Sequence, residues 1–130
     1  KAVAQFIKKA IGGENIVLKS NGKQYYSFLY VIDAVMGIFS VMLKGECGEA
    51  YNMADEICDA TLGEMASYAA KYGNSKVVYE VPDENEKAGY SVATKARLTN
   101  GKVLKLGWKA QYSAERGVRN TIKVLREVSI

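Results

Sequence analysis

QYYSFLYVID, residues 24–33, runs directly into the apolar segment AVMGIFSVMLK, residues 34–44. Aromatic and β-branched side chains fill much of positions 24–32, which predicts a strand. Asp33 follows at the junction, where its carboxylate is expected to cap the next helix by accepting backbone N–H groups. The helix expected over residues 34–44 is apolar almost all round, and Gly45 ends it. The stretch therefore predicts a strand that leads into a central, buried helix.

The segments before this stretch predict one more helix and a hairpin. Residues 1–11 have the pattern of an amphipathic helix, which Gly12 and Gly13 are expected to end. Residues 15–19, NIVLK, are expected to form a strand. Asn21-Gly22 suits the centre of a type I′ turn, because both central residues of that turn need a positive φ. We therefore expect residues 15–19 and 24–32 to pair as a β-hairpin.

The segments after the stretch predict alternating strands and helices. Thr61 and Glu64 have the spacing of a capping box, and the helix that they open is expected to end at Gly73. The other expected elements are a strand over residues 50–53, a strand over 76–81, an acidic loop over 82–87, a short helix over 100–105 and a last helix from Ser113. The order α-β-β-α-β-α-β-α-α indicates a small mixed α/β domain.

Length and composition fit one domain over residues 1–130, with ordinary fractions of hydrophobic (48%) and charged (25%) residues. The net charge of +4 is spread along the chain, whereas nucleic-acid binders gather charge on one face, so we expect no nucleic-acid partner. No apolar run is long enough for a signal peptide or a membrane span. Two cysteines and no histidine favour reduced thiols in a cytoplasmic protein over metal ligands.

Three stretches in order carry a family resemblance: residues 24–33, then GEAYNMA at 48–54, then LGW at 106–108. Together they resemble the C-terminal, substrate-binding part of extended short-chain dehydrogenase/reductases, the NAD-dependent nucleotide-sugar epimerase/dehydratase family. The resemblance covers nearly the whole chain. It implies the fold of a small mixed α/β substrate-binding subdomain, without the Rossmann domain of that family.

The resemblance implies a function as part of a larger enzyme. Family members bind a nucleoside-diphosphate sugar between two domains, and the Rossmann domain holds NAD(P) and carries the catalytic Tyr-x-x-x-Lys pair. The chain is thus expected to bind substrate in a dTDP- or UDP-glucose-type 4,6-dehydratase or 4-epimerase, beside its own N-terminal Rossmann domain. It opens without Met and is expected to be a fragment that is inactive alone; the full-length enzyme is a possible homodimer.

The resemblance also implies substrate-binding positions. The family commonly has an arginine for pyrophosphate at the place of Tyr26, and a tyrosine offers a hydrogen bond there without a charge. A second basic residue is usual before the LGW triplet, and Lys95 falls at that offset, with Arg97 two residues later. We therefore expect Tyr26, Lys95 and Arg97 to bind substrate, with Lys95 preferred over Arg97. The alternative for Lys95 and Arg97 is a role as solvated surface charges, and the alternative for Tyr26 is that the substrate is held differently or that the position no longer binds it.

No catalytic, cofactor-binding or metal-binding residue is expected within the chain. The sequence has no Gly-x-x-Gly-x-x-Gly run to approach a dinucleotide. Tyr72 and Lys76 match Tyr-x-x-x-Lys, but Gly73 and Asn74 are expected to break the helix between them. The chemistry needs both side chains on one helical face, so this pair is predicted to be structural.

Two other functions stay open at this point. A stand-alone, non-catalytic binding or interaction module for an anionic ligand would also suit a mildly basic α/β domain. A nucleic-acid binder would show strongly salt-dependent affinity. The sugar, the base, the choice between NAD and NADP and the type of reaction are not fixed by these residues.

Overall fold

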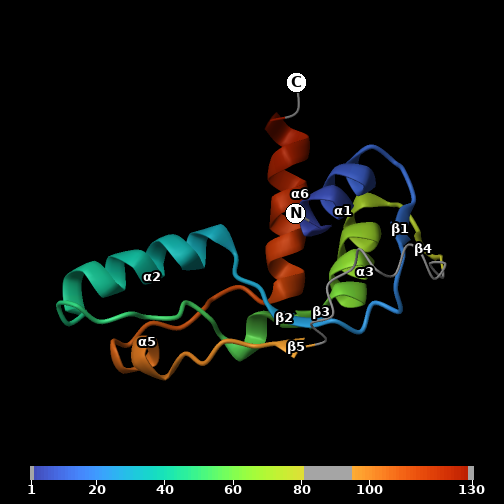
Figure 1. Cartoon of the computed structure of the whole chain (residues 1–130). Helices are drawn as coiled ribbons and strands as arrows, with labels where there is room; N and C mark the ends of the chain where they lie inside the picture. The colour runs from blue at the N-terminus through green and yellow to red at the C-terminus, as the bar shows by residue number, and fades with distance from the viewer. Residues whose placement is uncertain (1, 81–94, 129–130) are drawn as a thin grey trace.

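The computed structural model of the protein describes residues 2–80 and 95–128 (Figure 1). Its helices are α1 (Ala2–Ile11), α2 (Val31–Lys44), the 3-10 turn η1 (Glu56–Cys58), α3 (Leu62–Gly73), α5 (Gly101–Lys105) and α6 (Ala114–Val128). Its strands are β1 (Ile16–Leu18), β2 (Tyr25–Ser27), β3 (Asp59–Thr61), β4 (Val77–Tyr79) and β5 (Lys95–Ala96). Helices α1 and α3 lie on one side of α6, and α2 and α5 lie on the other side (Figure 1).

The larger core forms where α1, α3 and α6 meet. Small residues line the contacting side of α3, and Gly73 at its end lies directly against Ala10 of α1. Because these residues carry little or no side chain, the helices can approach closely before larger residues fill the space. The buried members of this core are Phe6, Ile7, Ala10, Ile16, Leu18, Ala60, Met65, Ala66, Ala69, Ala70, Val118 and Ile122.

Two small sheets replace the predicted hairpin. Strand β1 pairs in parallel with β4, whereas β2 pairs antiparallel with β3 and parallel with β5. The chain turns here with Gly22 at φ +69°, but Asn21 has no positive φ, so the predicted type I′ turn does not form. Gly63 N–H donates to Gly22 O (2.9 Å) and Leu62 N–H donates to Gln24 O (2.8 Å), so the turn docks on the start of α3. The hairpin prediction is wrong because the turn directs its two flanking strands into different sheets.

The helix after β2 is not buried as predicted. It begins at Val31, two residues before Asp33, and the shorter strand β2 ends at Ser27. Only Asp33 and Gly37 are buried, and Gly37 lies against Met53 and Trp108. The exposed apolar residues of α2 are Val31, Ile32, Val35, Met36, Ile38, Phe39, Met42 and Leu43. The residues of α2 are apolar as predicted. They are exposed because no other described element packs over most of the helix.

The remaining predictions divide along the chain. Helices α3, α5 and α6 and strand β4 are confirmed, as is the capping box, in which Thr61 and Glu64 each accept from the other's backbone N–H. Residues 50–53 form no strand, and the regular structure of that region is η1 and β3 instead. The acidic loop expected over residues 82–87 lies outside the described residues. No helix within residues 2–80 and 95–128 is both long enough and apolar enough to cross a bilayer.

Candidate functional site

The sheet of strand order β3-β2-β5 carries all three predicted substrate-binding residues. Tyr26 lies at the centre of β2, opposite Ala60 of β3 and Ala96 of β5. Lys95 is the first residue of β5 and pairs with Tyr25. Arg97 follows directly after β5. The structure therefore places Tyr26 and Lys95 on two adjacent strands, with Arg97 directly after the second strand.

Their side chains do not all share one face of this sheet. Neighbouring residues of a strand point to opposite faces, and directly paired residues point to the same face. Tyr26 shares its face with Ala60, and its ring contacts that of Phe28 edge-on at 6.2 Å. Lys95 shares the opposite face with Tyr25. Tyr26 and Lys95 thus lie on opposite faces.

The face of Tyr26 continues through Phe28 into an apolar pocket of about 260 Å³. This pocket lies between α1, the β2–α2 connection and α6, and Phe28, Leu29 and Tyr30 form part of its wall. Cys58 also lines it, with its thiol donating to Tyr112 O at 3.2 Å. Burial, followed by the nearby carboxylates of Asp55, Asp33 and Asp59, raises the pKa of Cys58 to about 12. The thiol therefore stays protonated at neutral pH and is not a nucleophile.

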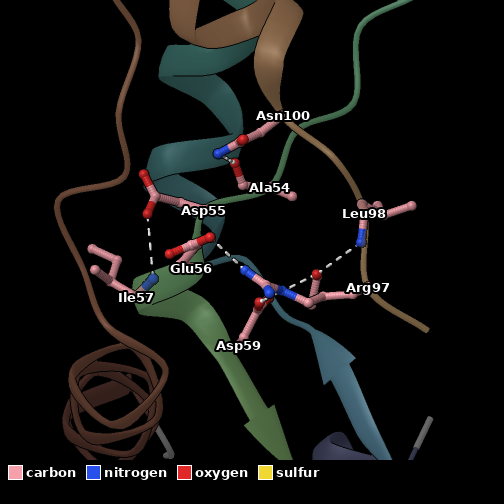
Figure 2. Close-up of polar contacts among 9 residues, drawn as sticks. Ala54, Asp55, Glu56, Ile57, Asp59, Arg97, Leu98 and Asn100 are labelled. Atoms are coloured by element: carbon pink, nitrogen blue, oxygen red, sulfur yellow. Dashed lines mark hydrogen bonds and ion pairs between the residues drawn. The ribbon is translucent and has the colours of Figure 1, made fainter. Parts of the chain in front are cut away.

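The opposite face carries an ion-pair cluster around Arg97 (Figure 2). Arg97 Nε donates to Asp59 Oδ2 at 2.5 Å, and its Nη2 donates to Glu56 Oε1 at 2.7 Å. The side chain of Asp59 is only 3% exposed, whereas that of Glu56 is 81% exposed. Hydrogen bonds from the guanidinium to Glu56, then to Asp59, raise the pKa of Arg97. The guanidinium thus bridges one buried and one exposed carboxylate.

Ser27 connects the same cluster to the backbone. Its hydroxyl donates to Asp59 Oδ1 at 2.7 Å and accepts from Leu98 N–H at 3.2 Å. Sequence reasoning missed Ser27, Glu56 and Asp59. No local signal could have found them, because the Arg97–Asp59 contact joins residues 38 positions apart and neither residue lies in an unusual sequence context.

A polar pocket of about 260 Å³ adjoins this cluster. Its lining residues are Glu56, Asp59, Arg97, Leu98, Thr99, Asn100 and Gly101. One guanidinium faces two carboxylates here, so the ionisable groups of the wall carry a net negative charge. Such a wall disfavours an anionic ligand unless the ligand lies beyond it, nearer to Lys95.

Asp33 and Trp108 fix the connection that leads into α6. Asp33 is 2% exposed, and its carboxylate accepts Gln111 N–H and Tyr112 N–H, both at 3.0 Å. Trp108 Nε1 donates to Asp33 O at 3.1 Å, and the buried indole packs with Cys58 and Val103. The predicted N-cap role of Asp33 is wrong, since Tyr30 holds that position. Asp33 is instead an acceptor for a distant loop.

Tyr72 and Lys76 do not lie on one helical face. Helix α3 ends at Gly73, and Asn74 has the left-handed φ of 61° that turns the chain away. Tyr72 OH donates to Glu115 Oε1 at 2.8 Å and so ties α3 to α6. This geometry agrees with the structural role predicted for Tyr72.

Among the described residues, no strand leads through a glycine-rich turn into a helix, the usual arrangement for a nicotinamide dinucleotide. Such a group is held where a strand leads through a glycine-rich turn into a helix N-terminus. In residues 2–80 and 95–128, β1 leads into the turn at Gly22, and β3 passes directly into α3 with the capping carboxylate of Glu64 at the helix start. The same residues contain no group of three or more Cys, Asp or Glu side chains arranged to hold a metal ion.

Comparisons with known proteins agree with the resemblance seen in the sequence. Residues 1–54 match the model of the NAD dependent epimerase/dehydratase family. The chain is 26% identical to dTDP-glucose 4,6-dehydratase of Xanthomonas campestris over 94% of this chain and 36% of that protein. It is 28% identical to the Haemophilus influenzae dTDP-glucose 4,6-dehydratase over 95% of this chain and 39% of that protein. The resemblance to NAD-dependent epimerases and dehydratases is confirmed.

Solved structures of epimerases and dehydratases share the fold. UDP-glucose 4-epimerase of Thermotoga maritima, solved with UDP-glucose, has a TM-score of 0.80 at 22% identity. The match covers 100% of this chain and 40% of the epimerase chain. dTDP-glucose 4,6-dehydratase of Bacillus anthracis, solved with NAD, has a TM-score of 0.79 at 19% identity. This match covers 99% of this chain and 40% of the dehydratase chain. The predicted fold class is therefore confirmed, and the chain spans less than half the length of these relatives.

Proposed function

We propose that this chain is the nucleoside-diphosphate-sugar-binding part of an NAD(P)-dependent epimerase or dehydratase. The observation that carries the proposal is the extent of the likeness. The fold of the Thermotoga maritima epimerase matches all of this chain, yet only 40% of that enzyme is accounted for. The binding of NAD(P) and the catalytic proton and hydride transfers are assigned to a Rossmann domain, because no described residue fits either task.

The surface of α2 supports a partner domain. Its eight exposed apolar residues form a continuous hydrophobic surface on one helix, from Val31 to Leu43. Soluble proteins seldom leave such a surface in water unless another surface covers it. We propose that the Rossmann domain packs on this surface of α2.

Two free cysteines, one exposed and one buried, are compatible with the cytoplasmic location expected for such an enzyme.

The proposed substrate contacts are made by Tyr26 and Lys95. Because these side chains lie on opposite faces of the sheet, one diphosphate would have to pass around β5, the outer of the described strands, to reach both. Lys95 would supply positive charge and Tyr26 a hydrogen bond. Arg97 lies in the wall of the adjoining polar pocket, where it forms ion pairs with Asp59 and Glu56. These residues would hold and orient the substrate and would take no proton from it.

Isothermal titration calorimetry tests the proposal, with dTDP-glucose and UDP-glucose as probes and NAD and the Rossmann domain present. We expect one of the two probes to bind, and Lys95→Ala to weaken its binding about tenfold through the loss of one charge-assisted contact. Lys76→Ala is the matched control, because Lys76 is also exposed and precedes a strand of the other sheet. If neither dTDP-glucose nor UDP-glucose binds, the proposed substrate class is refuted. Binding of NAD by the chain alone would contradict the division of tasks.

A further inference from the structure

Strand β5 is too short to be held by its backbone alone. It has two residues, Lys95 and Ala96, both exposed, and it pairs only with β2 among the described strands. Two backbone pairings on a solvent-exposed edge open easily. The position of Lys95 must therefore depend on side-chain contacts made near the strand.

Arg97 and Leu98 supply those contacts. Arg97 reaches Asp59 of β3, Ser27 of β2 donates to the same carboxylate, and Leu98 N–H donates back to Ser27 Oγ. One buried carboxylate thus connects all three strands of the sheet. Figure 2 shows Arg97 lying between Asp59 and Glu56, on the segment after β5 that continues past Leu98 to Asn100.

The charges around Arg97 oppose a direct role in anion binding. Two of its fork nitrogens already donate to carboxylates, and Asp59 is almost completely buried. Withdrawing the guanidinium toward a phosphate would leave Asp59 as a buried charge without its partner, which is strongly unfavourable. A ligand would also have to approach Glu56, a second negative charge. Arg97 is better placed to hold the sheet together than to hold a ligand.

We propose that Arg97 is a positioning residue, which fixes β5 through Asp59 and Ser27 so that Lys95 stands beside β2 to meet an anionic ligand. This inference rests on the proposed function for the identity of the ligand. It differs from the expectation for Arg97 drawn from the family resemblance, because Arg97 acts here through Lys95 and not by touching the substrate.

The two roles for Arg97 predict opposite effects of Asp59→Asn. If Arg97 were a ligand, neutralising Asp59 would free the guanidinium and leave anion binding unchanged or tighter. If Arg97 is a positioning residue, Asp59→Asn releases β5 and weakens binding. Ser27→Ala gives the same discrimination with less risk to folding, because it removes only the link between Asp59 and Leu98. We expect both variants to weaken the binding of dTDP-glucose or UDP-glucose by about fivefold or more.

The matched control is Glu127→Gln, which changes charge by the same amount in an exposed pair on α6. Thermal unfolding followed by circular dichroism identifies any variant that no longer folds. Unchanged or tighter binding by folded Ser27→Ala or Asp59→Asn would overturn the proposal and return Arg97 to the ligand role.

Hydrogen exchange provides a readout that needs no ligand. We expect the Leu98 amide to exchange about tenfold faster in Arg97→Gln, while the Ile122 amide inside α6 stays unchanged. An unchanged Leu98 amide would overturn the proposal. If neither sugar nucleotide binds the wild-type protein, the proposed function fails, and exchange at Leu98 still decides whether Arg97 holds β5.

Discussion

Gly73 of α3 lies directly against Ala10 of α1. A Cβ added there would lie 2.8 Å from the backbone carbon and oxygen of Ala10, closer than real Cβ atoms approach other atoms. These atoms belong to a helix and cannot move aside as the end of a flexible side chain could. Overpacking of this kind costs about 1 to 3 kcal/mol, more than the gain in helix propensity from Gly to Ala.

Gly73→Ala is therefore expected to lower the free energy of unfolding by about 2 kcal/mol. Gly101→Ala is the matched control, because Gly101 also lies in a helix and a Cβ there would meet nothing within 4 Å. Urea unfolding of both variants measures the difference. Equal stability of the two variants would show that α1 and α3 are not in close contact at this point.

Asp33 shows the limit of prediction at the scale of single residues. A carboxylate between a strand-like and a helix-like segment favours an N-cap, and that prediction used the only partners visible nearby. Its actual partners are the N–H groups of Gln111 and Tyr112, which lie 78 and 79 residues later. Thr61 could be predicted because its capping partner, Glu64, is three residues away.

At the scale of elements, a polar cluster around Glu115 joins α3 and α6. Glu115 of α6 accepts from Lys71 Nζ and from Tyr72 OH, both at 2.8 Å. The hydrogen bond from Lys71, followed by that from Tyr72, holds the pKa of Glu115 below its usual value. A carboxyl group whose pKa is lower in the folded state stabilises the protein above its unfolded pKa and loses that contribution as the pH falls.

Glu115→Gln should therefore make stability less sensitive to acid. Between neutral pH and about pH 3, below the ordinary Glu pKa of about 4.3, the wild-type melting temperature is expected to fall more than that of the variant. Melting curves across this range test the prediction, with Glu127→Gln as the control on the outer part of the same helix. Parallel pH profiles for wild type and Glu115→Gln would contradict it.

Elements were predictable where their signals are local. The ends of α3 follow from its capping box and from Gly73 and Asn74, and both were placed correctly from sequence. The pairing of β2 was not, because its partners β3 and β5 contain only three and two residues and have no clear alternation. A strand of two or three residues has too few side chains to show an alternating pattern, so its pairing partner cannot be predicted from its own sequence.

At the scale of the whole molecule, the uncovered surface of α2 dominates the expected behaviour in solution. Met42 and Leu43 are its most exposed members, at 73% and 80%. We expect the isolated chain to self-associate through this surface, and the double variant Met42→Glu/Leu43→Glu to be monomeric with an unchanged circular dichroism spectrum. Sedimentation velocity measures the difference. A wild-type chain that is already monomeric at high concentration would contradict the prediction.

The anchoring of Asp33 also has a consequence for biosynthesis. Helix α2 leaves the ribosome well before residues 111 and 112, so the carboxylate of Asp33 meets the N–H groups that it accepts only after 78 and 79 further residues have been translated. Contacts of such long sequence separation form late in folding, because their loop must first close. Until residues 111 and 112 have been translated, Asp33 therefore lacks the amide donors that fix the start of α2 to the rest of the fold.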